Sequence, residues 1–337
     1  MRRRRIFRYA GAIALLALVA LAVVAPGSAA QGWLTATVFW STVAVGSLVV
    51  LMIHRLTGGR WGETCAPVLV PTAAGVPWLA LLVVAVVVSA GVLYPWHDRA
   101  HVDASVASAY LNVPLFAVRS AIALAGWSAI AIVLPPLSGS RSLLVAGVGL
   151  AFHAIAISVI PVDWILSTAP GFTSSAFGAT IAVSQILAGI AWCAVWAPLP
   201  DDQAAADIAG LLLAAILGLV YMAFISFAVI WYGDVPEKIA WYLNHAGGWG
   251  WMSGATFIVG ALVPVALLLL GRRLGMIRAA RSAGACALAG LMLYDLWLIA
   301  PQFGAAAVLP AGLGLIAIGG LWLGFSAGRT AERPAHA

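Results

Sequence analysis

The chain has 337 residues, of which only 8% are charged and 64% are hydrophobic. A soluble domain of this length carries roughly a quarter charged residues, so this composition excludes a water-soluble globule and predicts an integral membrane protein. The net charge of +6 could indicate a nucleic-acid ligand. The arrangement of the basic residues between apolar segments argues against that class of partner.

Apolar runs of about 20 residues, the length with which a helix crosses a bilayer, recur along the whole sequence. The sequence therefore predicts an all-α polytopic membrane protein that forms a single membrane domain over residues 1–337. About ten spans are expected, near residues 9–27, 33–53, 77–95, 111–134, 142–160, 174–197, 208–231, 250–270, 282–300 and 308–326. Because ten is even, both termini are expected on the same side of the membrane.

The basic residues lie almost entirely on one side of this predicted topology. The opposite side has only Arg99 and Lys238, and Arg119 falls inside a span. The fourteen arginines on the side of the termini are Arg2, Arg3, Arg4, Arg5, Arg8, Arg55, Arg60, Arg141, Arg272, Arg273, Arg278, Arg281, Arg329 and Arg333. Cytoplasmic loops carry such an excess, so both termini are predicted to be cytoplasmic.

The N-terminal segment has a second interpretation. An arginine cluster, an apolar run and the small residues Ser28, Ala29 and Ala30 are also typical of a cleaved signal peptide. Cleavage after Ala30 would leave nine spans and would keep the orientation of the remainder. We favour retention of residues 1–30, which gives ten spans.

Ionisable side chains inside apolar spans are costly in a bilayer, so each is a candidate functional residue. Arg119 in the fourth span and His153 in the fifth are both expected near the midplane, where they could share one depth in neighbouring antiparallel helices. Pro161 is expected to break the fifth helix and to leave Asp163 at the periplasmic edge. Asp295 lies in the ninth span, about one and a half turns from its periplasmic end.

Each of these residues also has a purely structural interpretation. Arg119 could form an ion pair that only holds the helices together, and His153 could bond a neighbouring carbonyl group. Asp163 could cap the next helical segment, and for Asp295 the structural interpretation is the favoured one. The sequence leaves both interpretations open.

The sequence contains no strong motif for a metal or a covalently bound haem. His97 and His101 have HxxxH spacing, but two ligands without a firm helix make a weak metal site. Cys65, Cys193 and Cys286 occur singly, without CxxC or CxxCH motifs. They are therefore expected to be buried small side chains, without disulfides.

Five segments, in order along residues 32–251, resemble one family of membrane proteins. They are GWLTATVFWSTVAVGSLVVLMIHRLTGGRWGE (Gly32–Glu63), LYPW (Leu93–Trp96), YLNVPLFAVRSAI (Tyr110–Ile122), VDWILSTAPGFTSSAFG (Val162–Gly178) and AVIWYGDVPEKIAWYLNHAGGWGW (Ala228–Trp251). The most specific piece is the loop HRLTGGRWG, from His54 to Gly62. The chain thereby resembles the ActF membrane subunit of alternative complex III, in the NrfD/polysulfide-reductase membrane-subunit superfamily.

That resemblance implies two four-helix bundles plus two further helices in a bacterial inner membrane. It implies no covalently bound redox cofactor, with quinone or quinol as a possible ligand. The implied partners are a larger homologous membrane subunit, multihaem cytochrome c and iron–sulfur subunits, and in some cases a terminal oxidase. Such a complex oxidises quinol and reduces a cytochrome c or an oxidase. The positions that match a quinone-associated or proton-conducting role are Arg119, His153 and Asp163.

Three functions follow for testing. The favoured one is a cofactor-free subunit of a quinol-oxidising complex, in which His153 bonds a quinol hydroxyl and Asp163 passes protons outward. Such a chain is not a complete enzyme, because the electrons must leave through another subunit. The second function is a scaffold without ligand. A secondary transporter ranks last, because Pro161 lies near a span end and no internal repeat is visible.

Overall fold

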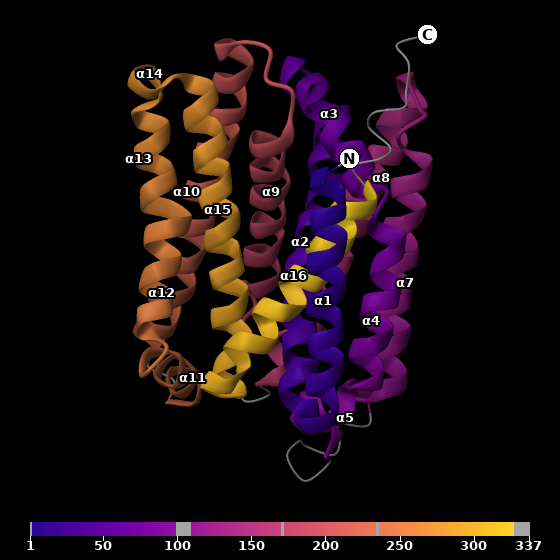
Figure 1. Ribbon diagram of the computed structural model, residues 1–337, viewed down its shortest axis with the longest axis vertical. Coiled ribbons are helices and arrows are strands. Elements are labelled where there is room, and N and C mark those ends of the chain that lie inside the picture. The colour runs from indigo at the N-terminus through magenta and orange to yellow at the C-terminus, as the bar shows by residue number, and fades with distance from the viewer. Residues whose placement is uncertain (1, 99–108, 170–171, 234–235, 327–337) are drawn as a thin grey trace.

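The computed structural model describes residues 2–98, 109–169, 172–233 and 236–326. Within these ranges the chain forms helices and no strand. Among the described residues, ten helical segments are long and apolar enough to cross a membrane, which confirms the expected all-α polytopic fold (Figure 1). Their composition makes this a multi-pass membrane protein.

The spans follow one another with short connections. Three short helices, α5 (Ala90–Leu93), α11 (Pro236–Ala246) and α14 (Gly271–Leu274), lie between them. The spans are α1 (Arg2–Val24), α2 (Pro26–Thr57), α3 with α4 (Arg60–Ala73 and Leu79–Val88), α7 (Val113–Val133), α8 (Gly139–Trp164), α9 (Phe177–Trp196), α10 (Asp202–Gly233), α12 with α13 (Gly250–Phe257 and Val263–Leu269), α15 (Met276–Ile299) and α16 (Val308–Ser326).

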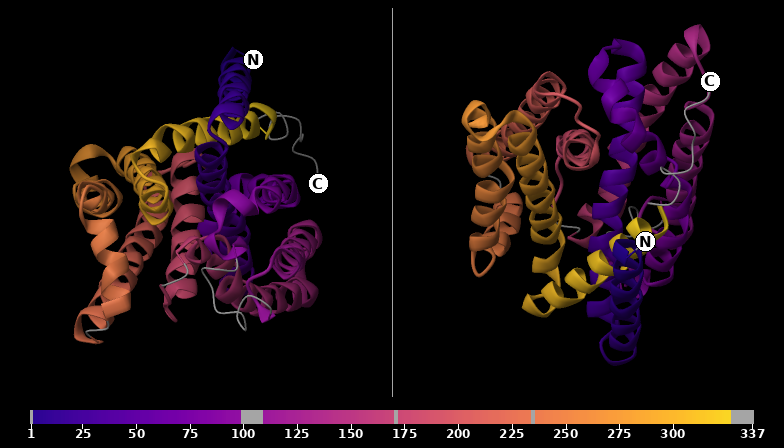
Figure 2. Two further views of the ribbon diagram at one scale, coloured as in Figure 1. Left: turned by 90° about the horizontal axis from the view of Figure 1, so that it is seen from below. Right: turned by 45° about the horizontal axis from the view of Figure 1, so that its top comes forward.

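The helices are arranged as two four-helix bundles and a peripheral pair. The first bundle contains α2, α3 with α4, α7 and α8, and the second contains α9, α10, α12 with α13, and α15. The helices α1 and α16 pack on each other, and α16 lies against α2 outside both bundles (Figure 2). This arrangement agrees with the expected two bundles plus two further helices.

Glycines bring α2 of the first bundle into backbone contact with α9 of the second. A Cβ atom on Gly46 would lie 2.0 Å from the carbonyl oxygen of Gln185, and one on Gly189 would lie 2.8 Å from the carbonyl oxygen of Gly46. Apolar side chains gain little by leaving lipid, so membrane helices associate through such close packing of small residues. The α2–α9 contact is therefore the main part of the seam between the bundles.

The peripheral pair is also joined through glycines. A Cβ atom on Gly11 of α1 would lie 2.7 Å from the backbone nitrogen of Leu321, and one on Gly320 would lie 2.7 Å from the carbonyl oxygen of Phe7. At the same end of the pair, Nε of Arg8 donates to the carbonyl oxygen of Gly324 at 2.8 Å. Thus α1 begins on the side of the molecule where α16 ends.

The expected start of the third span, near residue 77, is wrong. The span begins at Arg60 and includes Pro67 and Pro71 inside α3. A 3-10 turn, Val76–Trp78, then leads into α4. Neighbouring helices and local 3-10 geometry satisfy the backbone groups that prolines leave unbonded, so a membrane helix tolerates residues that usually indicate a loop.

The expectation that Pro161 breaks the fifth span is also wrong. The helix α8 continues through Pro161 to Trp164. The proline removes one helical hydrogen bond, the one that would end on the carbonyl oxygen of Ile157. Gly178, in the first turn of α9, packs against that same oxygen, because a Cβ atom there would lie 2.7 Å from it. Asp163 consequently belongs to the last turn of α8.

Candidate functional site

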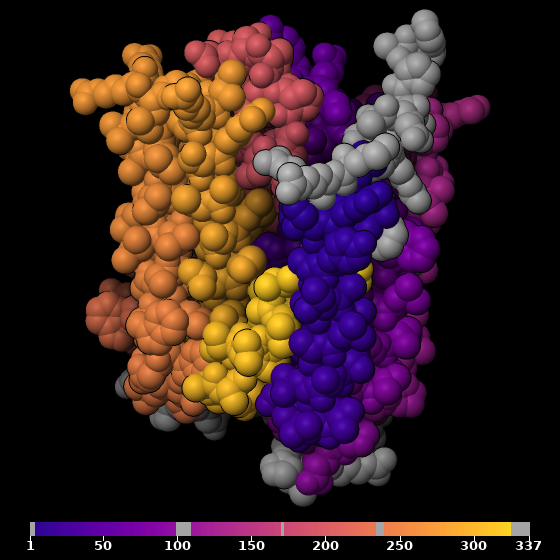
Figure 3. All heavy atoms as spheres, viewed as in Figure 1, coloured from indigo at the N-terminus to yellow at the C-terminus, as the bar shows by residue number. Residues whose placement is uncertain are grey.

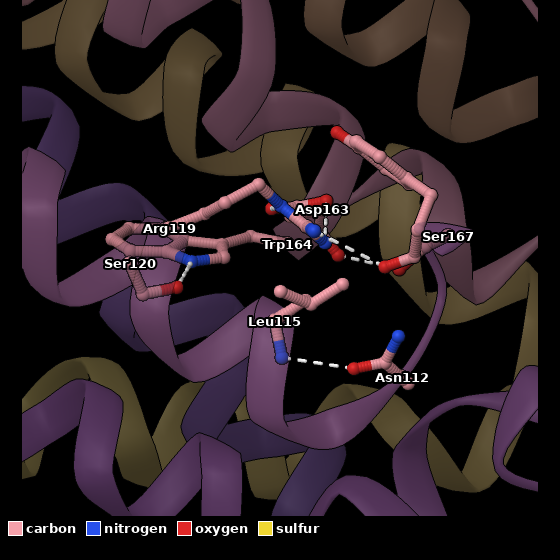
Figure 4. Close-up of polar contacts among 8 residues, drawn as sticks. Asn112, Leu115, Arg119, Ser120, Asp163, Trp164 and Ser167 are labelled. Atoms are coloured by element: carbon pink, nitrogen blue, oxygen red, sulfur yellow. Dashed lines mark hydrogen bonds and ion pairs between the residues drawn. The ribbon is translucent and has the colours of Figure 1, made fainter. Parts of the chain in front are cut away.

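Arg119 and Asp163 form a two-pronged ion pair between α7 and α8 (Figure 4). Nε of Arg119 lies 2.7 Å from Oδ2 of Asp163, and Nη2 lies 3.0 Å from Oδ1. The Asp163 side chain is fully buried and that of Arg119 is 18% exposed. The hydroxyl of Ser167 donates to the backbone carbonyl of Asp163. Two parallel charge-assisted hydrogen bonds fix the orientation of both side chains.

Tyr110 covers the guanidinium group of Arg119 at the start of α7. The Tyr110 carbonyl accepts a hydrogen bond from Nη1 at 3.1 Å, and Cζ of Arg119 lies 3.9 Å from the centre of the ring. Burial, with a further contribution from the Asp163 carboxylate, raises the pKa of Tyr110 to about 12. The phenol therefore stays protonated at neutral pH. Asn112 caps the helix by accepting a hydrogen bond from the Leu115 nitrogen at 2.9 Å.

Aromatic side chains hold the two helices together beside the ion pair. Nε1 of Trp164 donates to Oγ of Ser120 at 2.9 Å, which links α8 to α7 (Figure 4). The hydroxyl of Tyr94 donates to the carbonyl of Trp164 at 3.2 Å, and burial raises the pKa of Tyr94. These bonds connect three consecutive segments of the first bundle, so the ion pair sits in a rigid frame.

His153 lies in the middle of α8 and is 5% exposed. Neither ring nitrogen has a hydrogen-bond partner among the described residues. The ring packs near Trp127 of α7, with 6.0 Å between ring centres. A buried imidazole normally finds a partner, so these two nitrogens are the least satisfied polar atoms of the first bundle's candidate residues.

The expectation that Arg119 and His153 share one depth is wrong. The helix α7 begins at Val113, so Arg119 is only about 9 Å from its start, whereas Trp127, the neighbour of His153, is about 12 Å farther along. Because α8 continues past its proline, Asp163 reaches the level of Arg119. Ten residues, about 15 Å of rise, separate His153 from Asp163.

Asp295 lies apart from the other three candidates, in α15 of the second bundle. It is 3% exposed, and its Oδ2 atom has no hydrogen-bond partner within the described ranges. The structure thus joins Arg119 to Asp163, and leaves His153 and Asp295 each at a separate position.

Cavities are hollowed into the described part of the chain, and two of them have apolar walls. One of about 560 Å³ lies between α1, α2, α3 with α4, and α16. The other, of about 500 Å³, lies among α9, α10, α12 and α15, and its wall includes Tyr294 and Trp297. None of the four candidate residues lines either cavity.

The loop that carries the most specific piece of the family resemblance is held by its own contacts. A ring nitrogen of His54 lies 3.0 Å from the carbonyl oxygen of Gly59, and the ring meets Trp61 edge to face at 5.0 Å. His97 is described but His101 is not, so their predicted spacing lies partly outside the described residues. Among the residues that are described, no three His, Cys, Asp or Glu side chains gather as a metal site.

Sequence reasoning missed the residues that frame the ion pair. Tyr110 and Trp164 both lie in segments that carry the resemblance, next to Arg119 and Asp163, but their contacts depend on where the helices begin and end. A Tyr nine residues before an intramembrane Arg, with a helix-capping Asn112 between them, is the signal that could have indicated the contact.

A second buried histidine was missed as well. His245 on α11 is 1% exposed and stacks on Trp241, with 3.7 Å between ring centres. Its Nδ1 atom lies 2.7 Å from the Trp241 carbonyl oxygen, and Trp297 meets it from α15. Burial lowers the pKa of His245.

The arrangement in the first bundle favours two kinds of chemistry. A neutral imidazole offers one donor and one acceptor, so His153 is suited to bond a ligand hydroxyl or a water molecule. The carboxylate of Asp163 is held by Arg119 and has a well-defined position at the end of the bundle. Any proton exchanged between these two groups has to cross about 15 Å.

Comparison with known proteins does not identify the family. No model of a known protein family matches this chain, and no curated protein is significantly similar to it. The resemblance to alternative complex III subunits thus remains a hypothesis. The structure shows a multi-pass helical membrane fold with a buried ion pair at one end of its first bundle. Within that bundle it shows a histidine whose ring nitrogens have no hydrogen-bond partner among the described residues.

Proposed function

We propose that this chain is a cofactor-free membrane subunit of a quinol-oxidising respiratory complex and contributes a quinone-associated site or a proton route. The proposal rests on the environment of His153. This side chain is buried in the first bundle, and neither ring nitrogen has a hydrogen-bond partner among the described residues. A polar side chain kept unbonded at membrane depth is costly unless a ligand or water occupies it.

The chemistry assigned to the first bundle has two stages. Quinol oxidation releases protons, and the imidazole of His153 accepts a hydrogen bond from a quinol hydroxyl and takes up its proton. The carboxylate of Asp163, about 15 Å of rise farther along α8, receives protons at the end of the bundle. The electrons leave through a partner subunit, because this chain lacks haem and iron–sulfur motifs.

The proposed setting is a bacterial inner membrane with both termini in the cytoplasm. The arginine excess on the side where α1 begins and α16 ends supports this orientation. Asp163 then faces the periplasmic side, where protons from quinol would be released. The proposed partners are a larger homologous membrane subunit, multihaem cytochrome c and iron–sulfur subunits.

A structural role is the second candidate, and one observation favours it. Arg119 and Asp163 satisfy each other in a two-pronged pair within a frame of hydrogen bonds, which is also what a pure scaffold requires. In that case the chain holds the complex together and no ligand binds beside His153.

Purification in mild detergent from the native membrane tests the proposed complex. Co-purification of a haem-staining multihaem cytochrome c and a larger membrane subunit, identified by mass spectrometry, is the expected result. A chain that purifies without any haem protein would overturn the proposal and favour a transporter or a scaffold outside such a complex. Quinol turnover by the purified assembly, measured for the wild type and for a His153 variant, then distinguishes a quinone site or proton route from a purely structural role.

A further inference from the structure

The cavity of about 560 Å³ beside α1 has a fixed and almost wholly apolar wall. Trp33 of α2 donates its indole N–H to the carbonyl of Leu82 at 2.9 Å, which ties α2 to α4 at the cavity. Gly75 packs against the ring of Trp322, because a Cβ atom there would lie 2.5 Å from its Cζ2 atom. These contacts fix the positions of two indole rings in the wall of the recess.

The recess results from the irregular third span. The 3-10 turn at Val76–Trp78, which follows two prolines inside α3, interrupts the span beside α1 and α16. The residues at the opening are exposed, with Trp78 and Leu81 each at 64%. In a membrane this side faces the hydrocarbon of the bilayer, so the opening admits a lipid chain from the side.

Arginines lie on the same face of α1 as the cavity wall. Arg4, Arg8 and Leu15 are spaced by four and seven residues, which places them on one stripe of the helix, and Leu15 lines the cavity. Arg5 is exposed beside them. Arg8 is anchored to Gly324 of α16, only two residues beyond Trp322 of the cavity wall. Figure 3 shows α1 as an outer ridge of the molecule.

The distances fit one phospholipid molecule. From Arg8 to Leu15 the helix rises about 10 Å, and one leaflet of hydrocarbon is about 15 Å deep, half of the bilayer core. A phosphate group at the arginines therefore places an acyl chain of the same lipid at the level of the cavity. Guanidinium groups suit phosphate because they offer several donors in a plane.

We infer that α1, α3 with α4, and α16 form a binding site for an anionic phospholipid. Arg4, Arg5 and Arg8 hold the headgroup phosphate, and one acyl chain fills the cavity beneath them. This site lies along one side of the first bundle and does not involve His153 or Asp163. Its test therefore does not depend on the quinol proposal.

Native mass spectrometry of the detergent-purified chain tests the site with two defined probes. The chain is incubated with equal amounts of phosphatidylglycerol and phosphatidylcholine of identical acyl chains. The wild type is expected to retain phosphatidylglycerol preferentially. The variant Arg4→Gln/Arg5→Gln is expected to lower that preference about fivefold for each arginine removed. Arg8 is left in place because it also anchors α16.

A second variant tests the cavity separately from the charge. Ala74 is exposed at the cavity wall, so Ala74→Trp fills the recess and is expected to reduce retention of both lipids. The matched control is Arg272→Gln/Arg273→Gln, which removes two exposed arginines at the same side of the second bundle and is expected to leave the preference unchanged. Thermal unfolding of each variant shows that it is folded. Equal retention of both lipids by the wild type, or equal losses in variant and control, overturns the inference.

Discussion

At the scale of single residues, Arg119 and Asp163 form a two-pronged ion pair in which the Asp163 side chain is fully buried. A buried charge that loses its partner costs far more than the pair contributes, because it cannot be solvated. We therefore expect Asp163→Ala to lower the free energy of unfolding by about 3–5 kcal/mol. Unfolding of the detergent-solubilised chain by heat or denaturant measures this change.

The paired replacement distinguishes a structural ion pair from a functional one. Arg119→Leu/Asp163→Leu removes both charges, so it is expected to restore most of the stability that Asp163→Ala loses. If quinol turnover of the assembled complex stays low while stability returns, Asp163 has a role in the reaction. If turnover recovers together with stability, Asp163 has only a structural role.

His153 allows the cleanest separation of function from stability. Because its ring nitrogens have no partner among the described residues, His153→Leu removes an unsatisfied polar group and is expected to leave stability unchanged or raised. Under the quinol proposal, turnover of the purified complex falls by about 10²-fold. Gln185→Leu is the matched control, since Gln185 is also buried with an unbonded oxygen but lies on α9. Full turnover in His153→Leu contradicts the proposal.

His245 makes stability depend on pH. Its pKa in the folded state lies below the ordinary value of 6.5. As the pH falls below 6.5, the unfolded chain binds a proton that the folded chain does not, so stability decreases until the folded-state pKa is reached. We expect the melting temperature to fall between about pH 7 and pH 5, and His245→Phe to reduce this fall. If the melting temperature of His245→Phe depends on pH as that of the wild type does, His245 is not the source of the pH dependence.

The residues that matter chemically were mostly visible in the sequence, whereas their contacts were not. Arg119, His153, Asp163 and Asp295 stand out because each is ionisable within an apolar run. Which of them meet depends on helix ends. The start of α7 at Val113 and the continuation of α8 past its proline together place Asp163, and not His153, at the level of Arg119.

At the scale of helices, the two bundles meet through glycines of α2 and α9. Gly46 has no room for a side chain because a Cβ atom would lie 2.0 Å from a backbone oxygen. We expect Gly46→Ala to separate the helices and to lower the melting temperature strongly. Gly147 on α8 has nothing within 4 Å of such a Cβ atom, so Gly147→Ala is expected to be neutral or to stabilise by up to about 1 kcal/mol. Similar losses in both variants would show that packing at the seam is not the cause.

Regular helices could be predicted well and the irregular one could not. Spans such as residues 250–270 and 308–326 match the structure closely, because continuous apolar composition marks their ends. The third span was missed over its first half because Pro67, Pro71 and Gly75 are the residues that indicate loops. Their tolerance here depends on neighbouring helices, which a local pattern does not contain.

At the scale of the whole molecule, the arginine distribution predicts that both termini face the cytoplasm. Ser138 directly precedes α8, whereas Ser175 lies in the connection between the end of α8 and the start of α9, and both are exposed. With Cys286 replaced by Ala, a membrane-impermeant maleimide added to the periplasmic side of spheroplasts is expected to label Ser175→Cys and not Ser138→Cys. The buried Cys65 and Cys193 give little background. The reverse pattern would place the termini outside and contradict the arginine distribution.

The pairing of α1 with α16 has a consequence for how the protein is made. During synthesis α1 is made before the other nine spans, but the helix it packs against most closely is the last of these ten. The face of α1 that carries Gly11 therefore lacks its α16 partner while the eight spans between them are added. The final fold is completed when α16 arrives, so the peripheral pair acts as a closing step that follows assembly of both bundles.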